Sequence, residues 1–117
     1  MNETQDKINQ IQLIQQNIQN ISIQRQKFQI QETEIESALN EIEKTEVTYK
    51  IIGNIMVKSD KESLKKELKE KHEMLKVRIS ALEKQEERLR SNVEELQKEV
   101  LKDLENDAKQ SKTSRRD

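Results

Sequence analysis

This chain of 117 residues has few large apolar side chains, with 31% hydrophobic and 2% aromatic residues against 38% charged residues. So small an apolar content argues against a globular core, because it offsets little of the entropy lost when a backbone is ordered. Disorder and long helices that bury a narrow stripe both remain, and heptad spacing with abundant Glu, Lys, Leu and Gln favours helices. The 22 basic and 23 acidic residues are interspersed, so nucleic acid and acidic membranes are poor candidate partners.

Several kinds of chemistry lack their residues. The sequence has no Cys, which excludes disulfides, thiol catalysis and cysteine-based zinc sites, and its single Gly excludes a glycine-rich phosphate loop. His72 is the only His, and no Cys or second His can join it, so we expect no metal site and no cofactor. The carboxylates have salt-bridge spacing, and a helical hairpin offers no cleft, so we expect no enzyme. No apolar run has signal-peptide or membrane-spanning length, and we expect a soluble, cytoplasmic protein.

Residues 1–46 are predicted to form a helix that is rich in Gln and Asn. Its apolar residues alternate steps of three and four, as in a coiled-coil seam, once Arg25 and Glu32 fill two of the places. The apolar seam positions are Ile11, Ile14, Ile18, Ile21, Phe28, Ile35, Leu39 and Ile42. Leu13, Ile23 and Ile30 lie off this seam, where they either contact another chain or a client, or pack against a neighbouring subunit.

Residues 47–58 are predicted to form a β-hairpin, because apolar residues flank a two-residue Gly53-Asn54 turn. Gly53 supplies the positive φ that the first position of a type II′ turn requires, which places Ile52 opposite Ile55. By the same register Ile51 lies opposite Met56. Alternation puts Ile52, Ile55 and Val57 on one face and Tyr49, Ile51 and Met56 on the other. A lone hairpin with two apolar faces needs partners, so we expect an obligate oligomer.

Residues 59–104 are predicted to form a second, charged helix. Ser59 and Glu62 have the spacing of a capping box, and His72 and Glu86 fill two seam places. The apolar seam positions are Leu68, Leu75, Ile79, Leu82, Leu89, Val93, Leu96 and Val100. Residues 105–117 have no apolar residue larger than Ala and are predicted to be a disordered tail.

Two seams of similar length joined by a hairpin predict an antiparallel two-helix coiled coil, in a mainly α fold. If Glu46 lies beside Lys61, Phe28 faces Ile79 and Ile35 faces His72. Most layers then pair apolar residues with apolar residues. A register shifted by one heptad stays open.

Three stretches of this chain resemble the prefoldin family, and in particular its archaeal β-class subunits. They are Glu43-Lys44-Thr45, then Val47-Thr48-Tyr49-Lys50 with Gly53-Asn54, and Leu82-Glu83-Lys84-Gln85-Glu86-Glu87-Arg88-Leu89. The resemblance covers roughly residues 5–104. Heptads occur in any coiled coil, but a Tyr-Lys-x-x-Gly-Asn hairpin between two heptad helices is more specific. The single hairpin matches the β class, since α-class subunits carry two.

The resemblance implies a hexamer of two α-class and four β-class subunits, whose hairpins join into intersubunit β-barrels while the helices extend as tentacles. It implies an ATP-independent holdase that captures unfolded or nascent polypeptides and delivers them to a group II chaperonin. The oligomerisation hairpin would comprise Tyr49, Ile51, Ile52, Gly53, Asn54, Ile55, Met56 and Val57.

The resemblance also implies a client-binding tip where both helices end far from the hairpin. In the register above, the tip gathers Ile8, Ile11, Leu13, Ile14, Val100, Leu101 and Leu104. Aliphatic side chains suit varied clients, because apolar contact is non-directional and several tentacles can bind at once. The alternative function is a structural coiled-coil adaptor that binds a folded partner.

Overall fold

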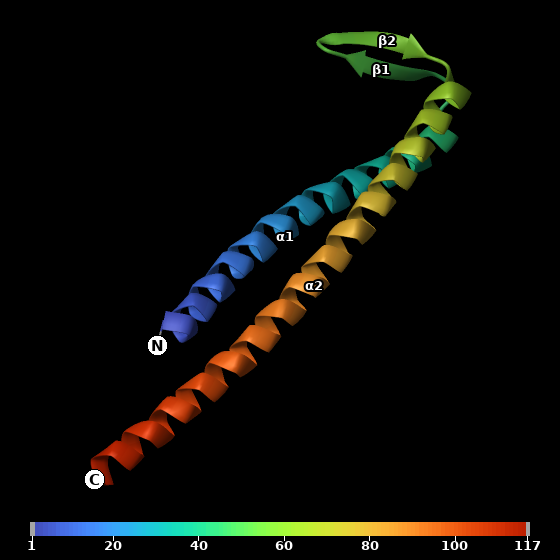
Figure 1. Ribbon diagram of the computed structural model, residues 1–117. Helices are drawn as coiled ribbons and strands as arrows, with labels where there is room; N and C mark the ends of the chain where they lie inside the picture. The colour runs from blue at the N-terminus through green and yellow to red at the C-terminus, as the bar shows by residue number, and fades with distance from the viewer. Residues whose placement is uncertain (1, 117) are drawn as a thin grey trace. The chain divides into compact units, whose positions relative to one another are not determined.

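In the part of the chain that the structure describes, two long helices flank a single β-hairpin (Figure 1). The structure is a computed structural model that describes the backbone of residues 2–116 and the side chains of residues 3–110. The chain order is α1 (Asn2–Glu43), β1 (Thr48–Ile52), β2 (Ile55–Ser59) and α2 (Lys61–Arg116). The mainly helical fold with one hairpin between the helices is therefore confirmed. None of the described helices has an apolar stretch of membrane-spanning length.

The chain divides into two units, which are described separately. The helix-end unit comprises Met1–Ile23 with Glu83–Asp117, and the hairpin unit comprises Gln24–Leu82. The helix-end unit thus contains the start of α1 and the end of α2. The hairpin unit contains both strands and the helical segments that adjoin them, and β1 and β2 project from the place where α1 ends and α2 begins (Figure 1).

Polar contacts between the helices establish the register inside each unit. Three of the interhelical pairs are Glu36–His72 and Glu43–Lys65 in the hairpin unit and Thr4–Asp103 in the helix-end unit. Rising positions of α1 meet falling positions of α2, as an antiparallel coil requires. Each pair lies within about one residue of the predicted register, whereas a one-heptad shift would separate the partners by about 10 Å. The register predicted from the sequence is confirmed within each unit.

The predicted seams are the buried stripes of both helices. Every seam position, polar ones included, is buried or half-buried. The most buried apolar side chains are Ile18, Ile42, Leu75, Ile79 and Val93. Leu13, Ile23 and Ile30, which lie off the seam, are exposed as predicted.

The strands pair as the sequence predicts, with Ile52 opposite Ile55 and Ile51 opposite Met56. Gly53 has φ +61°, and it is the only described residue with a positive φ, as a type II′ turn requires. On the hairpin face that carries Ile52, the positions remote from the turn are polar. Thr48 is buried there, and its hydroxyl donates to the Ser59 carbonyl at 2.9 Å.

α1 ends at Glu43, a little before the predicted end at residue 46. The amide of Lys44 donates to the Glu41 carbonyl at 3.1 Å, and the Thr45 hydroxyl donates to the same oxygen at 2.8 Å. These bonds tighten the last turn and satisfy a carbonyl that a continuing helix would have used. β-branched residues follow at once, which favours the change to an extended strand.

The cap of α2 is Asp60, so the predicted capping box at Ser59 and Glu62 is wrong by one residue. The Asp60 carboxylate accepts from the Ser63 amide at 3.1 Å and from the Ser63 hydroxyl at 2.9 Å. Ser59 is instead the last residue of β2, and its carbonyl accepts a hydrogen bond from the Thr48 hydroxyl of β1. Asp is a preferred N-cap residue, and its negative charge is favourable at a helix N-terminus.

α2 continues past Leu104 as far as Arg116, so the predicted disordered tail is helical as far as that residue. The segment has no Gly or Pro to end the helix. Extending an existing helix through Glu, Lys, Ala and Gln is favourable or nearly neutral, whereas starting a new helix is costly. The prediction of a disordered tail rested on the absence of apolar seam residues after Leu104, which does not by itself end a helix. The side chains of residues 111–117 lie outside the described residues.

Candidate functional site

The predicted tip residues all lie in the helix-end unit and fall into two groups by exposure. Ile8, Ile11, Ile14 and Val100 are half-buried, because Ile11, Ile14 and Val100 are seam positions and Ile8 lies beside the seam. Three leucines lie off the seam, and their exposed fractions are 67% for Leu13, 61% for Leu101 and 51% for Leu104. The seam residues therefore hold the helices together, and the leucines are the apolar side chains free to touch another molecule.

A shallow groove of about 490 Å³ lies beside Leu13 in the same unit. Both helices contribute its lining, which comprises Gln10, Leu13, Ile14, Asn92, Glu95, Leu96 and Glu99. Its lining thus combines aliphatic side chains with amide and carboxylate groups. Such a surface can hold an apolar side chain of an extended polypeptide, while amide and carboxylate groups remain for its backbone N–H groups.

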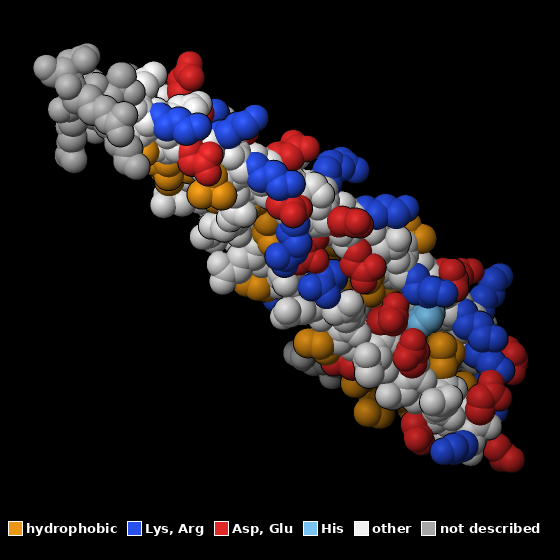
Figure 2. Space-filling model, turned by 90° about the horizontal axis from the view of Figure 1, so that it is seen from below, with side chains coloured by type: hydrophobic (Ala, Val, Ile, Leu, Met, Phe, Trp, Pro, Cys, Tyr) orange, Lys and Arg blue, Asp and Glu red, His pale blue; other side chains and the backbone are white. Residues whose placement is uncertain are grey.

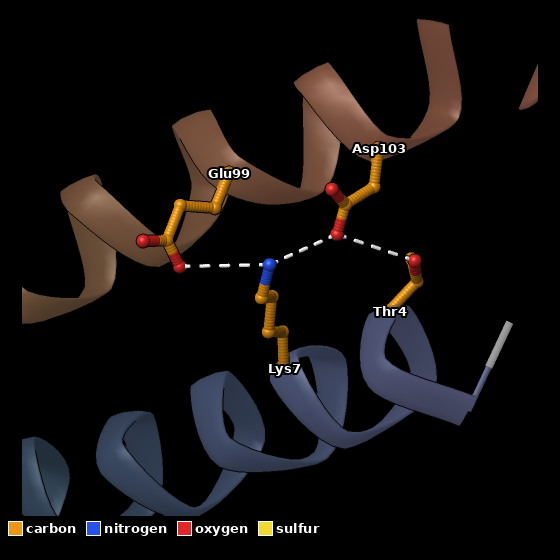
Figure 3. Close-up of polar contacts among 4 residues, drawn as sticks. All are labelled: Thr4, Lys7, Glu99 and Asp103. Atoms are coloured by element: carbon orange, nitrogen blue, oxygen red, sulfur yellow. Dashed lines mark hydrogen bonds and ion pairs between the residues drawn. The ribbon is translucent and has the colours of Figure 1, made fainter. Parts of the chain in front are cut away.

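A polar clasp joins the two helix ends of this unit (Figure 3). The Lys7 ammonium lies 3.0 Å from the Asp103 carboxylate and 3.8 Å from that of Glu99, and the Thr4 hydroxyl donates to Asp103 at 3.3 Å. The hydrogen bond from Lys7 lowers the pKa of Asp103, and the same bond raises the pKa of Lys7. The clasp fixes the helix ends beside the exposed leucines.

Acidic and basic side chains are interspersed over the face shown in Figure 2, and apolar side chains appear between them. This mixture agrees with the formal net charge of −1. Apolar contact with local polar contact, rather than a long-range field of one sign, is therefore the chemistry this face offers.

The predicted oligomerisation residues are exposed on both faces of the hairpin. The exposed apolar side chains are Tyr49, Ile51, Ile52, Ile55, Met56 and Val57. Among the described residues the sheet has two strands, so within them each strand also has an unpaired edge. Exposed apolar faces and free backbone edges together are the features of a sheet that adds strands from other chains.

Lys50 connects the hairpin to α2 in the hairpin unit. Its ammonium lies 2.8 and 2.9 Å from the two carboxylate oxygens of Glu67, and this hydrogen bonding lowers the pKa of Glu67. The hairpin face that carries Lys50 is therefore joined to α2 by a polar contact.

Sequence reasoning did not identify Lys7, Asp103 or Lys50 as site residues. Each makes its contact across elements. Lys7 and Asp103 belong to no distinctive motif, and the hairpin motif that contains Lys50 does not indicate its partner on α2. The clasp could have been found by applying the predicted register to the first turns of α1, because the register places Thr4 opposite Asp103. The Lys50–Glu67 contact depends on the orientation of the hairpin, which no periodicity encodes.

Comparisons with known proteins agree on one family. Residues 5–112 match the family model described as "Prefoldin subunit". The prefoldin subunit beta of Thermococcus onnurineus is 43% identical over 101 residues, which covers 84% of this chain and 87% of that protein. The prefoldin subunit beta of Pyrobaculum islandicum is 34% identical over 103 residues, covering 86% and 82%. The crystal structure of the prefoldin beta subunit from Thermococcus strain KS-1 is similar with a TM-score of 0.82 and 39% identity, covering 87% of this chain and 92% of that one.

Proposed function

Because this chain belongs to the prefoldin family, we propose that it is a β-class subunit of an ATP-independent holdase and has no enzymatic activity. In this proposal the complex works in the cytoplasm, captures unfolded or nascent polypeptides and delivers them to a group II chaperonin. The chaperone role is the general role of the family. The positions and exposure of the apolar side chains at the helix ends support one step of this proposal, the capture of clients.

Exposure of three leucines at the helix ends is the observation that supports client capture. Leu13, Leu101 and Leu104 are more than half exposed in a unit whose seam residues are covered. Exposed aliphatic side chains that gather in one place lower solubility, so such a group often marks a surface that binds another molecule. An unfolded client exposes similar side chains, and burying both surfaces is favourable without requiring a particular sequence.

Assembly through the hairpin is the second part of the proposal. The partner set is two α-class subunits with four chains of this kind, whose hairpins join into β-barrels. Unpaired strand edges and exposed apolar faces at Ile51, Ile52, Ile55 and Met56 support it. Strand addition would satisfy the edges, and closure of a barrel would bury one of the faces. Several tentacles per complex would then raise avidity for one client.

The test replaces Leu13, Leu101 and Leu104 with Ser in one variant and measures suppression of aggregation of an unrelated unfolded protein, without nucleotide, by light scattering. Each complex is first assembled with an α-class subunit, and its mass is measured. If each leucine buries about half of its surface on the client, the three together lose about 3 kcal/mol of binding. We expect the mass to be unchanged and the concentration needed for half-suppression to rise at least about tenfold.

The control replaces Met74 and Val77 with Ser. Each of these helical residues is more than half exposed, as the leucines are, but both lie in the hairpin unit. We expect this variant to assemble and to suppress aggregation like the unmodified chain. Equal loss in both variants would show that helical apolar surface in general, rather than the tip, binds clients. Absence of any α-dependent assembly would count against the whole proposal.

A further inference from the structure

Three potential metal ligands converge between α1 and α2 in the hairpin unit. Glu32 and Glu36 lie one helical turn apart on α1, and His72 reaches them from α2. One ligand atom from each residue lies within 4.8 Å of the others, and His72 Nε2 is 3.0 Å from Glu36 Oε1. Figure 2 shows the His side chain at the surface, next to acidic side chains.

This convergence has a cost that the coiled coil alone does not explain. Glu32 and His72 occupy seam positions where an apolar side chain would be more stabilising, and both are half-buried. Glu32 and Glu36 are like charges four residues apart, which is destabilising on a helix. Among the residues whose side chains are described, no Lys or Arg forms an ion pair with either carboxylate. A cation between the three groups would relieve both the repulsion and the partial burial of charge.

We propose that Glu32, Glu36 and His72 form a zinc site that links α1 to α2. An imidazole nitrogen with two carboxylates suits Zn²⁺ better than Mg²⁺ or Ca²⁺, which prefer a shell of oxygen ligands. Tetrahedral zinc with bonds of about 2.0–2.1 Å places its ligand atoms about 3.3 Å apart, close to the spacing of His72 and Glu36. Glu36 is exposed, so its side chain can adjust, and water would complete the shell. The sequence predicted no metal site because it has no Cys or second His to join His72, whereas the two carboxylates meet His72 only in the folded chain.

The test titrates the chelator-treated chain of 117 residues with ZnCl₂ by isothermal titration calorimetry, with MgCl₂ as the comparison ion. We expect one Zn²⁺ per chain with a Kd of about 1–10 μM, no comparable binding of Mg²⁺, and a melting temperature that rises by several degrees with zinc. Glu36→Gln and His72→Gln should each weaken zinc binding at least about tenfold. Glu36 is exposed, so its variant is expected to fold normally, which circular dichroism without zinc will check.

Glu34→Gln is the matched control, because it is the same change in an exposed residue of the same helix. It should leave zinc affinity and the zinc-induced rise in melting temperature unchanged. The proposal is overturned if no saturable zinc binding is found below about 1 mM. It is also overturned if Glu36→Gln and Glu34→Gln bind zinc equally well, since binding would then be a general property of surface carboxylates.

Discussion

Two nearby residues of α2, one on the seam and one off it, are expected to differ clearly in their contribution to the free energy of unfolding. Ile79 is 8% exposed, whereas Val77 is 68% exposed on the same helix. Replacing Ile79 with Ala removes three buried carbons at about 0.8 kcal/mol each, less a few tenths regained because Ala is the better helix former. We therefore expect Ile79→Ala to lower the free energy of unfolding by about 2 kcal/mol. Val77→Ala removes two carbons that are mostly solvated already, so little burial is lost. The same gain in helix propensity then leaves the change in the free energy of unfolding near zero.

Urea unfolding followed by far-UV circular dichroism measures both variants. The protein concentration must be the same throughout, because oligomerisation contributes to the apparent stability. With an m-value of about 2 kcal/mol/M, the midpoint of Ile79→Ala should fall by about 1 M, while that of Val77→Ala should hardly move. Equal shifts would refute the reasoning, because they would mean that the apolar stripe is not the part of the helix that is covered.

Two further predictions concern the hairpin and the clasp. Gly53→Ala meets no atom within 4 Å, so its cost is conformational, about 1–2 kcal/mol from the positive φ, and we expect weaker assembly with the α-class subunit by analytical ultracentrifugation. Unimpaired assembly would show that the turn tolerates a side chain. For the clasp, the pKa of Asp103 is lowered in the folded state, so its stabilising effect is present above its unfolded pKa of about 3.9 and is lost as pH falls through the lower folded value. The melting-temperature difference between the unmodified chain and Asp103→Asn should therefore shrink between pH 6 and pH 3, and a constant difference would contradict the role of Lys7.

Several contacts could be predicted from the sequence because a repeating pattern encodes them. The heptad spacing identified the buried stripe residue by residue, and the Gly53-Asn54 turn set the strand register, since a shift of one residue would exchange the two faces. The exposure of Leu13 followed from the same pattern, because a residue that breaks the heptad spacing cannot lie on the seam. Family-specific residues around the hairpin, beginning with Tyr49, then indicated the family.

The ends of the helices and strands were less predictable, because neighbouring residues compete there for the same hydrogen bonds. Ser59 and Asp60 are both good N-cap residues, but Ser59 is paired with Thr48 in the hairpin, and the Asp60 carboxylate accepts from the Ser63 amide. The predicted end of α2 at residue 104 was also wrong, because the helix continues to Arg116. A missing seam removes tertiary support but does not terminate a helix, and no Gly or Pro after Leu104 does so either.

The sequence by itself determined the periodic features of this protein: two amphipathic helices, their seam, the hairpin between them and its register. Periodicity encodes these because side-chain direction repeats every 3.6 residues in a helix and every two in a strand. Only the tertiary structure decided which polar groups meet across elements, namely Lys7 with Asp103, Lys50 with Glu67, and His72 with its carboxylates. Such contacts depend on the distance and rotation between elements to within an ångström or two, and no single helix or strand carries that information.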